Sequence, residues 1–141
     1  MNKIGFLFVT SVTLALGISA SANSTGNSGN TVKTTCADEA HYPLITKAEL
    51  KDVAAKKAAF IVDVNSEESF KKVHVPGAIH FAANEKEFTQ VLPKDKNTMI
   101  VSYCGGVQCS AWKKAAQEAC NLGYTNIRHF KEGIQGWTAS N

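Results

Sequence analysis

Residues 99–122 constrain the fold more than any other part of the chain, because they join a buried strand to a helix through a short loop that contains two cysteines. Residues 99–103 form an apolar run typical of a buried strand. From Ser110 onward alanines recur at helical spacing among good helix formers, which predicts a helix. Between these elements Cys104 is followed by two adjacent glycines, which allow backbone angles that other residues avoid. The segment therefore predicts a cysteine where a strand ends and a loop leads into a helix.

That geometry suits an anionic sulfur. The first turn of a helix leaves backbone N–H groups unpaired and carries partial positive charge. A glycine-containing loop can add further N–H groups around the same point and form an anion-binding nest. At such sites a cysteine pKa falls from about 8.5 to roughly 3.5–7.5. Cys104 is therefore a candidate nucleophile, and the alternative is an inert buried cysteine at a strand end.

The remaining segments alternate between strand and helix patterns. The expected strands cover residues 43–45, 59–64, 78–81, 99–103 and 126–130. The expected helices cover residues 46–57, 66–70, 85–92 and 110–122. This order predicts an α/β fold with a mainly parallel sheet of about five strands, flanked by helices on both faces. Ligands of such sheets bind beyond the carboxyl ends of the strands, which is where Cys104 falls.

The chain has 141 residues, enough for one good core and too few for two full-sized domains. Its net charge of +3 comes from 15 basic and 12 acidic residues. The lysines are scattered and Arg128 is the only arginine. This balance is too mild for a nucleic-acid-binding surface, so we expect no nucleic-acid partner.

Residues 1–22 have the pattern of a secretory signal peptide. Lys3 precedes a largely apolar run over residues 4–18, and Ala20-Ser21-Ala22 fits the small-residue cleavage pattern. The apolar run is too short for a membrane span, and no cysteine follows it directly as a lipid attachment site. We therefore expect cleavage near Ala22, a periplasmic or secreted protein, and no stable membrane insertion.

Residues 23–40 are expected to form a flexible linker, and residues 41–141 the folded domain. The stretch 23–35 is rich in Ser, Thr, Asn and Gly and cannot bury enough apolar surface to fold.

Four cysteines allow three full pairings. Cys104 and Cys109 stand across one loop, so a disulfide forms if their Cα atoms come within about 4.4–6.8 Å. Cys109 is then a redox partner or a resolving thiol; alternatively it only fills the first helical turn. Cys36 is free, or it ties the N-terminal segment to Cys120, which is otherwise a small core residue. No two cysteines have the Cys-x-x-Cys spacing of a typical zinc site, so we expect no zinc site.

The central segment resembles the active-site segment of the rhodanese-like domain, the family of single-domain thiosulfate sulfurtransferases. Three further motifs resemble the family in order and spacing: Ile61-Val62-Asp63-Val64, His74-Val75-Pro76-Gly77-Ala78-Ile79 and Glu132-Gly133-Ile134-Gln135-Gly136-Trp137. Together the motifs cover about residues 41–137.

The resemblance implies that Cys104 accepts sulfur from a donor such as thiosulfate, forms a persulfide, and passes the sulfur to a thiol or cyanide. It implies no metal or organic cofactor. The residues implied to bind the anionic sulfur through backbone N–H groups are Gly105, Gly106, Val107, Gln108, Cys109 and Ser110. Asp63 and Trp137 are candidate supporting residues, although capping of N–H groups and core packing explain them equally well.

The sequence also departs from the family pattern. The family loop commonly carries a basic residue where this chain has Cys109, so an anionic donor loses a charge-assisted contact. Lys113 and Lys114, one turn into the helix, are candidates to compensate. The usual Asp-x-Arg is here Asp63-Val64-Asn65. We therefore expect weak thiosulfate activity or another donor, such as a persulfide.

Three functions remain open. The first is a sulfurtransferase or persulfide carrier with Cys104 as nucleophile. The second is a periplasmic thiol–disulfide redox protein that uses Cys104 and Cys109, with a thioredoxin-like protein as partner. The third is a non-catalytic rhodanese-like binding module. A phosphatase of the related Cys-x5-Arg type is excluded because no arginine stands near Ser110.

Overall fold

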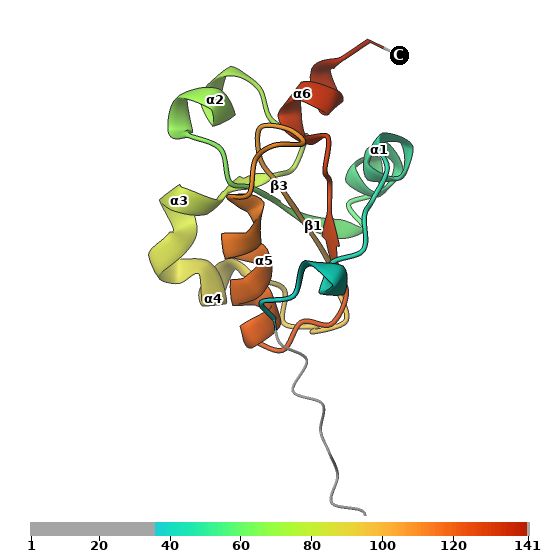
Figure 1. The fold of residues 1–141 in the computed structure, drawn as a ribbon. Coiled ribbons are helices and arrows are strands. Elements are labelled where there is room, and N and C mark those ends of the chain that lie inside the picture. The colour runs from blue at the N-terminus through green and yellow to red at the C-terminus, as the bar shows by residue number, and fades with distance from the viewer. Residues whose placement is uncertain (1–35, 141) are drawn as a thin grey trace, which may run out of the picture. The chain divides into compact units, whose positions relative to one another are not determined.

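Four parallel strands form the sheet at the centre of the computed structural model, which describes residues 36–140 (Figure 1). The strands lie in the order β2-β1-β3-β4, and their bounds are Ala59–Asp63 for β1, Ile79–His80 for β2, Met99–Tyr103 for β3 and Ile127–His129 for β4. The fifth strand expected at residues 43–45 is reduced to a single parallel bridge between Leu44 and His129. The sheet therefore has four strands rather than about five. Pro43 contributes to this, because it has no N–H group to donate to a neighbouring strand.

The helices are short, and two begin at the predicted caps. Their bounds are Lys47–Ala55 for α1, Glu67–Lys72 for α2, Phe81–Asn84 for α3, Phe88–Val91 for α4, Trp112–Asn121 for α5 and Gly133–Thr138 for α6, with 3-10 turns η1 at Glu39–His41 and η2 at Glu85–Glu87. Thr46 and Glu49 form the expected capping box of α1. The Ser66 side chain accepts from the amide of Ser69 at the start of α2.

The segment between β2 and β3 differs from its prediction. The strand expected at 78–81 ends at His80 because Phe81 already begins α3. The helix expected at 85–92 is present as the 3-10 turn η2 followed by α4, and α3 precedes it. Phe81 and Phe88 are both buried and their rings contact edge to face. This contact packs α3 against α4.

Helices cover both faces of the sheet, as predicted (Figure 1). Along β3, Ile100 packs with α3, α4 and α5 on one face, while Val101 and Tyr103 pack with α1 and α6 on the other. This alternation follows from the two-residue period of a strand. Both faces of β3 are buried, so the strand that leads to Cys104 lies inside the molecule.

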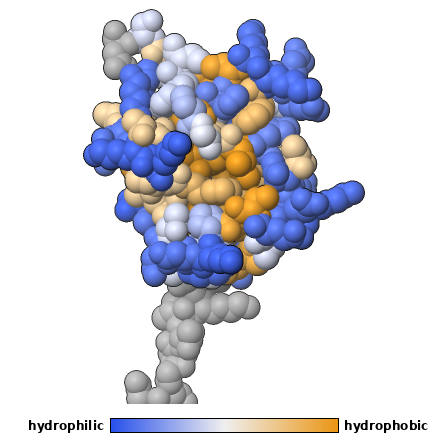
Figure 2. Space-filling model, turned by 180° about the vertical axis from the view of Figure 1, so that it is seen from behind, coloured by the Kyte–Doolittle hydropathy of each residue, from blue (hydrophilic) through white to orange (hydrophobic). Residues whose placement is uncertain are grey.

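The predicted signal peptide, residues 1–22, and most of the predicted linker lie outside the described residues. The last part of the linker, residues 36–40, is described: Cys36 is bonded to Cys120, and η1 begins at Glu39. The folded part of the chain therefore includes residues on the N-terminal side of His41. Across residues 36–140 no helix has the length and hydrophobicity needed to cross a membrane. The face opposite that of Figure 1 carries a band of hydrophobic surface bordered by polar side chains (Figure 2).

Candidate active site

Cys104 follows the last residue of β3 and is 2% exposed. The strand before it is an inner strand, and the carbonyl oxygen of Tyr103 accepts a 2.9 Å hydrogen bond from the amide of Val64. The loop that Cys104 opens leads into α5 at Trp112. The predicted order of strand, cysteine, loop and helix is therefore confirmed, with the helix starting two residues later than Ser110.

The structure joins Cys104 and Cys109 in a disulfide, with Cα atoms 6.3 Å apart. The second disulfide joins Cys36 and Cys120, with Cα atoms 5.7 Å apart. This is one of the three pairings that the sequence left open, and both Cα separations lie within the range of about 4.4–6.8 Å that disulfides span. The nucleophile candidate is thus covalently blocked in this state, and reduction must precede any attack by Cys104.

The backbone of the loop offers unpaired donors. Within the described residues only the Cys109 amide of this loop donates a hydrogen bond, to the carbonyl oxygen of Gly106 at 2.9 Å. The amides of Gly105, Gly106, Val107, Gln108 and Ser110 have no such partner. The N-terminus of α5 has no side-chain cap either. Because Cys109 stands just before this terminus, both loop sulfurs lie at the partially positive end of a helix.

The helix α6 holds the other side of the loop. The amide of Ile134 donates to the carbonyl oxygen of Cys104 at 2.9 Å, and the amide of Gln135 donates to that of Gly105 at 3.0 Å. Gly133 has φ +59°, and a Cβ atom there would lie 2.6 Å from the Gly106 nitrogen. A glycine is therefore required where α6 meets the loop.

Asp63 acts on the loop indirectly. Its carboxylate is fully buried and accepts from the Tyr103 hydroxyl at 2.6 Å and from the amide and side chain of Asn65 at 2.8 and 2.7 Å. The Tyr103 hydroxyl also accepts from the amide of Val75 at 3.0 Å. Burial and the bond to Asp63 raise the pKa of Tyr103. Asp63 thus fixes the residue before Cys104 and caps the turn at Asn65, but it makes no hydrogen bond to the loop itself.

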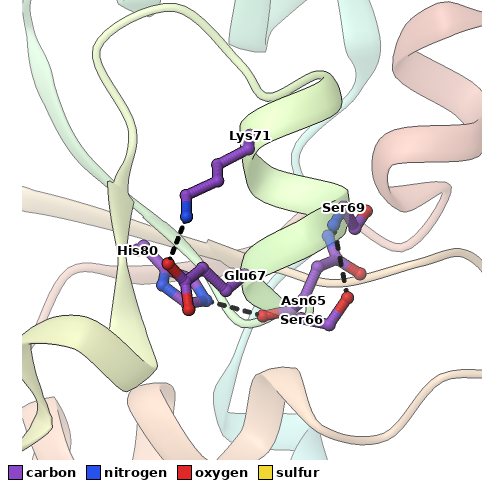
Figure 3. Close-up of polar contacts among 6 residues, drawn as sticks. All are labelled: Asn65, Ser66, Glu67, Ser69, Lys71 and His80. Carbon is purple, nitrogen blue, oxygen red and sulfur yellow. Dashed lines mark hydrogen bonds and ion pairs between the residues drawn. The ribbon is translucent and has the colours of Figure 1, made fainter.

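Polar contacts link the turn at Asn65 to β2 and stabilise the helix α2 that follows the turn (Figure 3). His80, at the end of β2, donates from Nε2 to the carbonyl oxygen of Asn65 at 2.8 Å. On the exposed side of α2, Lys71 pairs with Glu67 at 2.5 Å. Asn65 lies beside the loop, since its side-chain oxygen is 3.6 Å from the point where a Cβ of Gly105 would stand.

Trp137 is half-buried and packs against the apolar cluster beneath α1 and α6. It does not line either of the two pockets that adjoin the loop. Its position is that of a packing residue.

Among the pockets that the described residues form, two adjoin the loop. The first, which we call the glycine pocket, has about 370 Å³ and is lined by Gly105, Gly106, Val107, Gln108, Cys109 and Gln135. The second, which we call the histidine pocket, has about 310 Å³ and is lined by His129, Trp112, Lys113, Lys131, Glu39, Tyr42, Leu44 and the loop residues 107–110. Cys109 lines both pockets, and Cys104 lines neither.

The sequence reasoning missed His129 as a site residue. The residue is 8% exposed, and its ring stacks on that of Trp112 with centroids 3.6 Å apart. Burial lowers its pKa to about 4, with Glu39 opposing this effect and Lys131 and Lys113 adding to it. The signal was available, because His129 ends a strand next to β3 and the carboxyl ends of parallel strands share one edge of the sheet.

The two lysines expected to serve an anionic donor are each paired with a carboxylate. Lys113 forms an ion pair with Glu39, and Lys114 pairs with Glu85 at 2.5 Å. Within residues 36–140 no group of three or more His, Cys, Asp or Glu side chains is arranged to hold a metal ion.

The chain is similar in sequence and in structure to several known proteins. The model of the rhodanese-like domain matches residues 46–140. The uncharacterised protein YibN of Escherichia coli K12 is 30% identical over 101 residues, which are 70% of this chain and 68% of YibN. The thiosulfate sulfurtransferase GlpE of Coxiella burnetii is 23% identical over 99 residues, which are 70% of this chain and 89% of GlpE. The human single-domain sulfurtransferase TSTD1 superposes with a TM-score of 0.57 at 23% identity, over 70% of this chain and 98% of TSTD1, which shows a shared fold.

Proposed function

The chain belongs to the rhodanese-like domain family, and on that basis we propose that it is a sulfurtransferase or persulfide carrier that moves sulfane sulfur through Cys104. The carrying observation is the placement of Cys104 at the end of β3, in a loop whose unpaired amides lead into α5. The sulfurtransferases among its relatives support sulfur transfer in general.

The reaction starts from the reduced loop. The Cys104 thiolate attacks the outer sulfur of a donor such as thiosulfate, a bond forms between Cys104 Sγ and that sulfur, and sulfite leaves with the electron pair of the broken S–S bond. An acceptor thiol or cyanide then attacks the outer sulfur, and Cys104 leaves as a thiolate. The loop amides from Gly105 to Ser110 stabilise the anionic sulfur at each stage.

Cys109 provides a second route by which sulfur can leave the Cys104 persulfide. Its thiolate attacks Cys104 Sγ of the persulfide, hydrosulfide leaves, and the Cys104–Cys109 disulfide forms. The outer sulfur takes up the two electrons that the thiols lose, so the step needs no external oxidant. A dithiol, such as a thioredoxin-like protein, or two small thiols then restore the reduced loop.

The charge of the loop favours a less anionic donor than thiosulfate. No residue from Gly105 to Ser110 is charged, and Lys113 and Lys114 are paired with carboxylates. Each missing charge-assisted hydrogen bond costs about 1.5–3 kcal/mol of binding. A low-molecular-weight persulfide is therefore the better donor.

We further propose that the protein works outside the cytoplasm. The signal-peptide pattern of residues 1–22 supports export to the periplasm or to the medium. Two disulfides suit an oxidising compartment.

The second candidate is a thiol–disulfide redox protein, which the Cys104–Cys109 disulfide favours. Both functions are tested with protein that is chemically reduced, desalted and treated with thiosulfate or a glutathione persulfide. Intact mass and peptide mapping then follow each sulfur. Cys109→Ser is expected to trap one added sulfur on Cys104, whereas the wild type releases sulfide and regains the disulfide. Cys104→Ser is the matched variant and is expected to take up none.

Full sulfur transfer by Cys104→Ser would exclude the proposed function. A Cys109→Ser protein that takes up no sulfur from either donor, in a chain whose wild type still cycles between dithiol and disulfide, would establish the redox protein instead. Absence of both activities would leave a binding module.

A further inference from the structure

In the oxidised loop, Cys109 is the more accessible of the two bonded cysteines. Cys104 is 2% exposed and lines neither pocket, whereas Cys109 is partly exposed and lines both. Thiol–disulfide exchange requires the incoming sulfur to reach the sulfur that it attacks. This difference in exposure favours attack of a reductant on Cys109 Sγ.

The surroundings of Cys104 also make it a good leaving group when Cys109 is attacked. Attack on Cys109 Sγ expels Cys104 as a thiolate into the loop, beside unpaired amides and the N-terminal end of α5. A thiolate stabilised in this way is a better leaving group. Steric access and electrostatics thus favour the same direction of attack.

The histidine pocket offers a place for the incoming thiol. Its volume of about 310 Å³ lies at the lower end of the range for small-molecule sites. Lys131 forms no ion pair within the described residues, and Lys113 is balanced by Glu39. The ring nitrogens of His129 make no hydrogen bond to other described residues, and the ring is held flat on Trp112. The pocket therefore combines one uncompensated cation, a free polar ring and an accessible disulfide sulfur.

We propose that the histidine pocket binds an acidic low-molecular-weight thiol that reduces the loop disulfide by attacking Cys109. The thiolate forms a bond with Cys109 Sγ, the Cys104–Cys109 bond breaks, and its electron pair stays on Cys104. A second thiolate attacks the sulfur of the first small thiol, which releases Cys109 as a thiolate and the small thiol as its disulfide. This inference rests on the proposed function, because it supplies the free Cys104 on which sulfur transfer depends.

The direction of attack is tested by quenching a brief reaction of the oxidised wild type with glutathione. Acid and an alkylating reagent trap the intermediate, and peptide mapping locates the glutathione. The expected result is glutathione on Cys109 and the alkyl group on Cys104. Glutathione on Cys104 would overturn the proposal.

The pocket is tested by rates of reduction with glutathione, neutral mercaptoethanol and cationic cysteamine, each divided by its thiolate concentration. Lys131→Gln is expected to slow glutathione by about two- to five-fold, the range of an exposed ion pair, and to leave mercaptoethanol unchanged. Lys94→Gln, which makes the same charge change on an exposed residue outside the pocket, is expected to alter neither rate. Equal effects of the two variants would overturn the proposal. Reduction by thioredoxin alone, with no reaction of glutathione, would assign the surface to a protein partner and also overturn it.

These results are separable from the proposed function. Sulfur uptake is measured on chemically reduced protein, which bypasses the pocket. If the pocket experiments fail while Cys104 still accepts sulfur, sulfur transfer stands and only the assignment of the reductant is lost.

Discussion

The amide of Ile134 donates a 2.9 Å hydrogen bond to the carbonyl oxygen of Cys104, so the last helix of the domain is tied to the candidate nucleophile. The neighbouring bond from Gln135 to Gly105 repeats the contact one residue further along the loop. Two carbonyl groups of the loop are thus turned towards α6. The approach depends on Gly133, whose backbone lies against the same part of the loop.

Gly133→Ala is expected to destabilise the protein and to disturb the loop. The left-handed backbone at φ +59° costs a non-glycine residue about 1–2 kcal/mol. The added Cβ would also lie 2.6 Å from the Gly106 nitrogen and 2.7 Å from the Gly105 carbonyl carbon, which are backbone atoms that cannot turn away. Urea unfolding measures the loss. Gly77→Ala is the control, because Gly77 has φ +81° but nothing within 4 Å, and an equal loss in both variants would contradict the steric argument.

Tyr103→Phe is expected to lower the free energy of unfolding by about 1–3 kcal/mol. The variant leaves the fully buried Asp63 without a 2.6 Å donor and the amide of Val75 without its acceptor. Tyr124→Phe removes a hydroxyl that donates to one carbonyl oxygen, that of Pro93, and is expected to cost less. Chemical denaturation of both variants at pH 7 measures the two losses of unfolding free energy. A smaller loss for Tyr103→Phe than for Tyr124→Phe would contradict the prediction.

Much of the fold could be predicted from local patterns in the sequence. The capping box at Thr46 and Glu49 and the strand–loop–helix order around Cys104 depend on neighbouring residues, so the sequence predicted them. The fifth strand was wrong because a pattern of three residues cannot show that Leu44 makes only one bridge. The helix expected at residues 85–92 is helical over Glu85–Val91, but its first turn is a 3-10 turn, which the sequence pattern did not distinguish from α-helix.

The site was only partly predictable, because some of its residues are neighbours in the sequence and others come together only in the folded chain. The loop is contiguous, so its residues and the Cys104–Cys109 spacing were visible in the sequence. The histidine pocket combines Glu39, Lys113 and His129 from three separate segments, and only the folded sheet brings them together. The ion pair between Lys113 and Glu39 could not be predicted from the sequence either. This pair neutralises a lysine that the sequence suggested as a partner for an anionic donor.

The two disulfides are expected to contribute unequally to stability. Cys36 and Cys120 are separated by 84 positions, and Cys104 and Cys109 by 5. Chain-entropy reasoning then gives about 4–5 kcal/mol for the long closure and about 2 kcal/mol for the short one. Thermal unfolding of the Cys36→Ser/Cys120→Ser and Cys104→Ser/Cys109→Ser double variants tests this order. A larger loss for the loop pair would show that the short disulfide has a stabilising role beyond chain entropy.

The burial of His129 links stability to pH. Its folded pKa of about 4 lies below the unfolded value of 6.5, because burial disfavours the charged ring. Between these values the unfolded chain binds more protons than the folded one, so the free energy of unfolding falls as the pH falls from 6.5 towards 4. The full contribution is present above pH 6.5 and amounts to roughly 1–3 kcal/mol.

His129→Phe is expected to remove this part of the pH dependence while keeping an aromatic ring on Trp112. Denaturant unfolding of wild type and variant is compared from pH 7.5 to pH 4.5. The carboxylates of Glu49 and Glu67, whose pKa values are lowered by hydrogen bonds to Thr46 and Lys71, are present in both proteins and contribute equally to both curves. The difference between the two curves therefore reports His129 alone. Its stability advantage should shrink steadily below pH 6.5, and parallel curves across the window would mean that the ring is as easily protonated in the folded protein as in the unfolded chain.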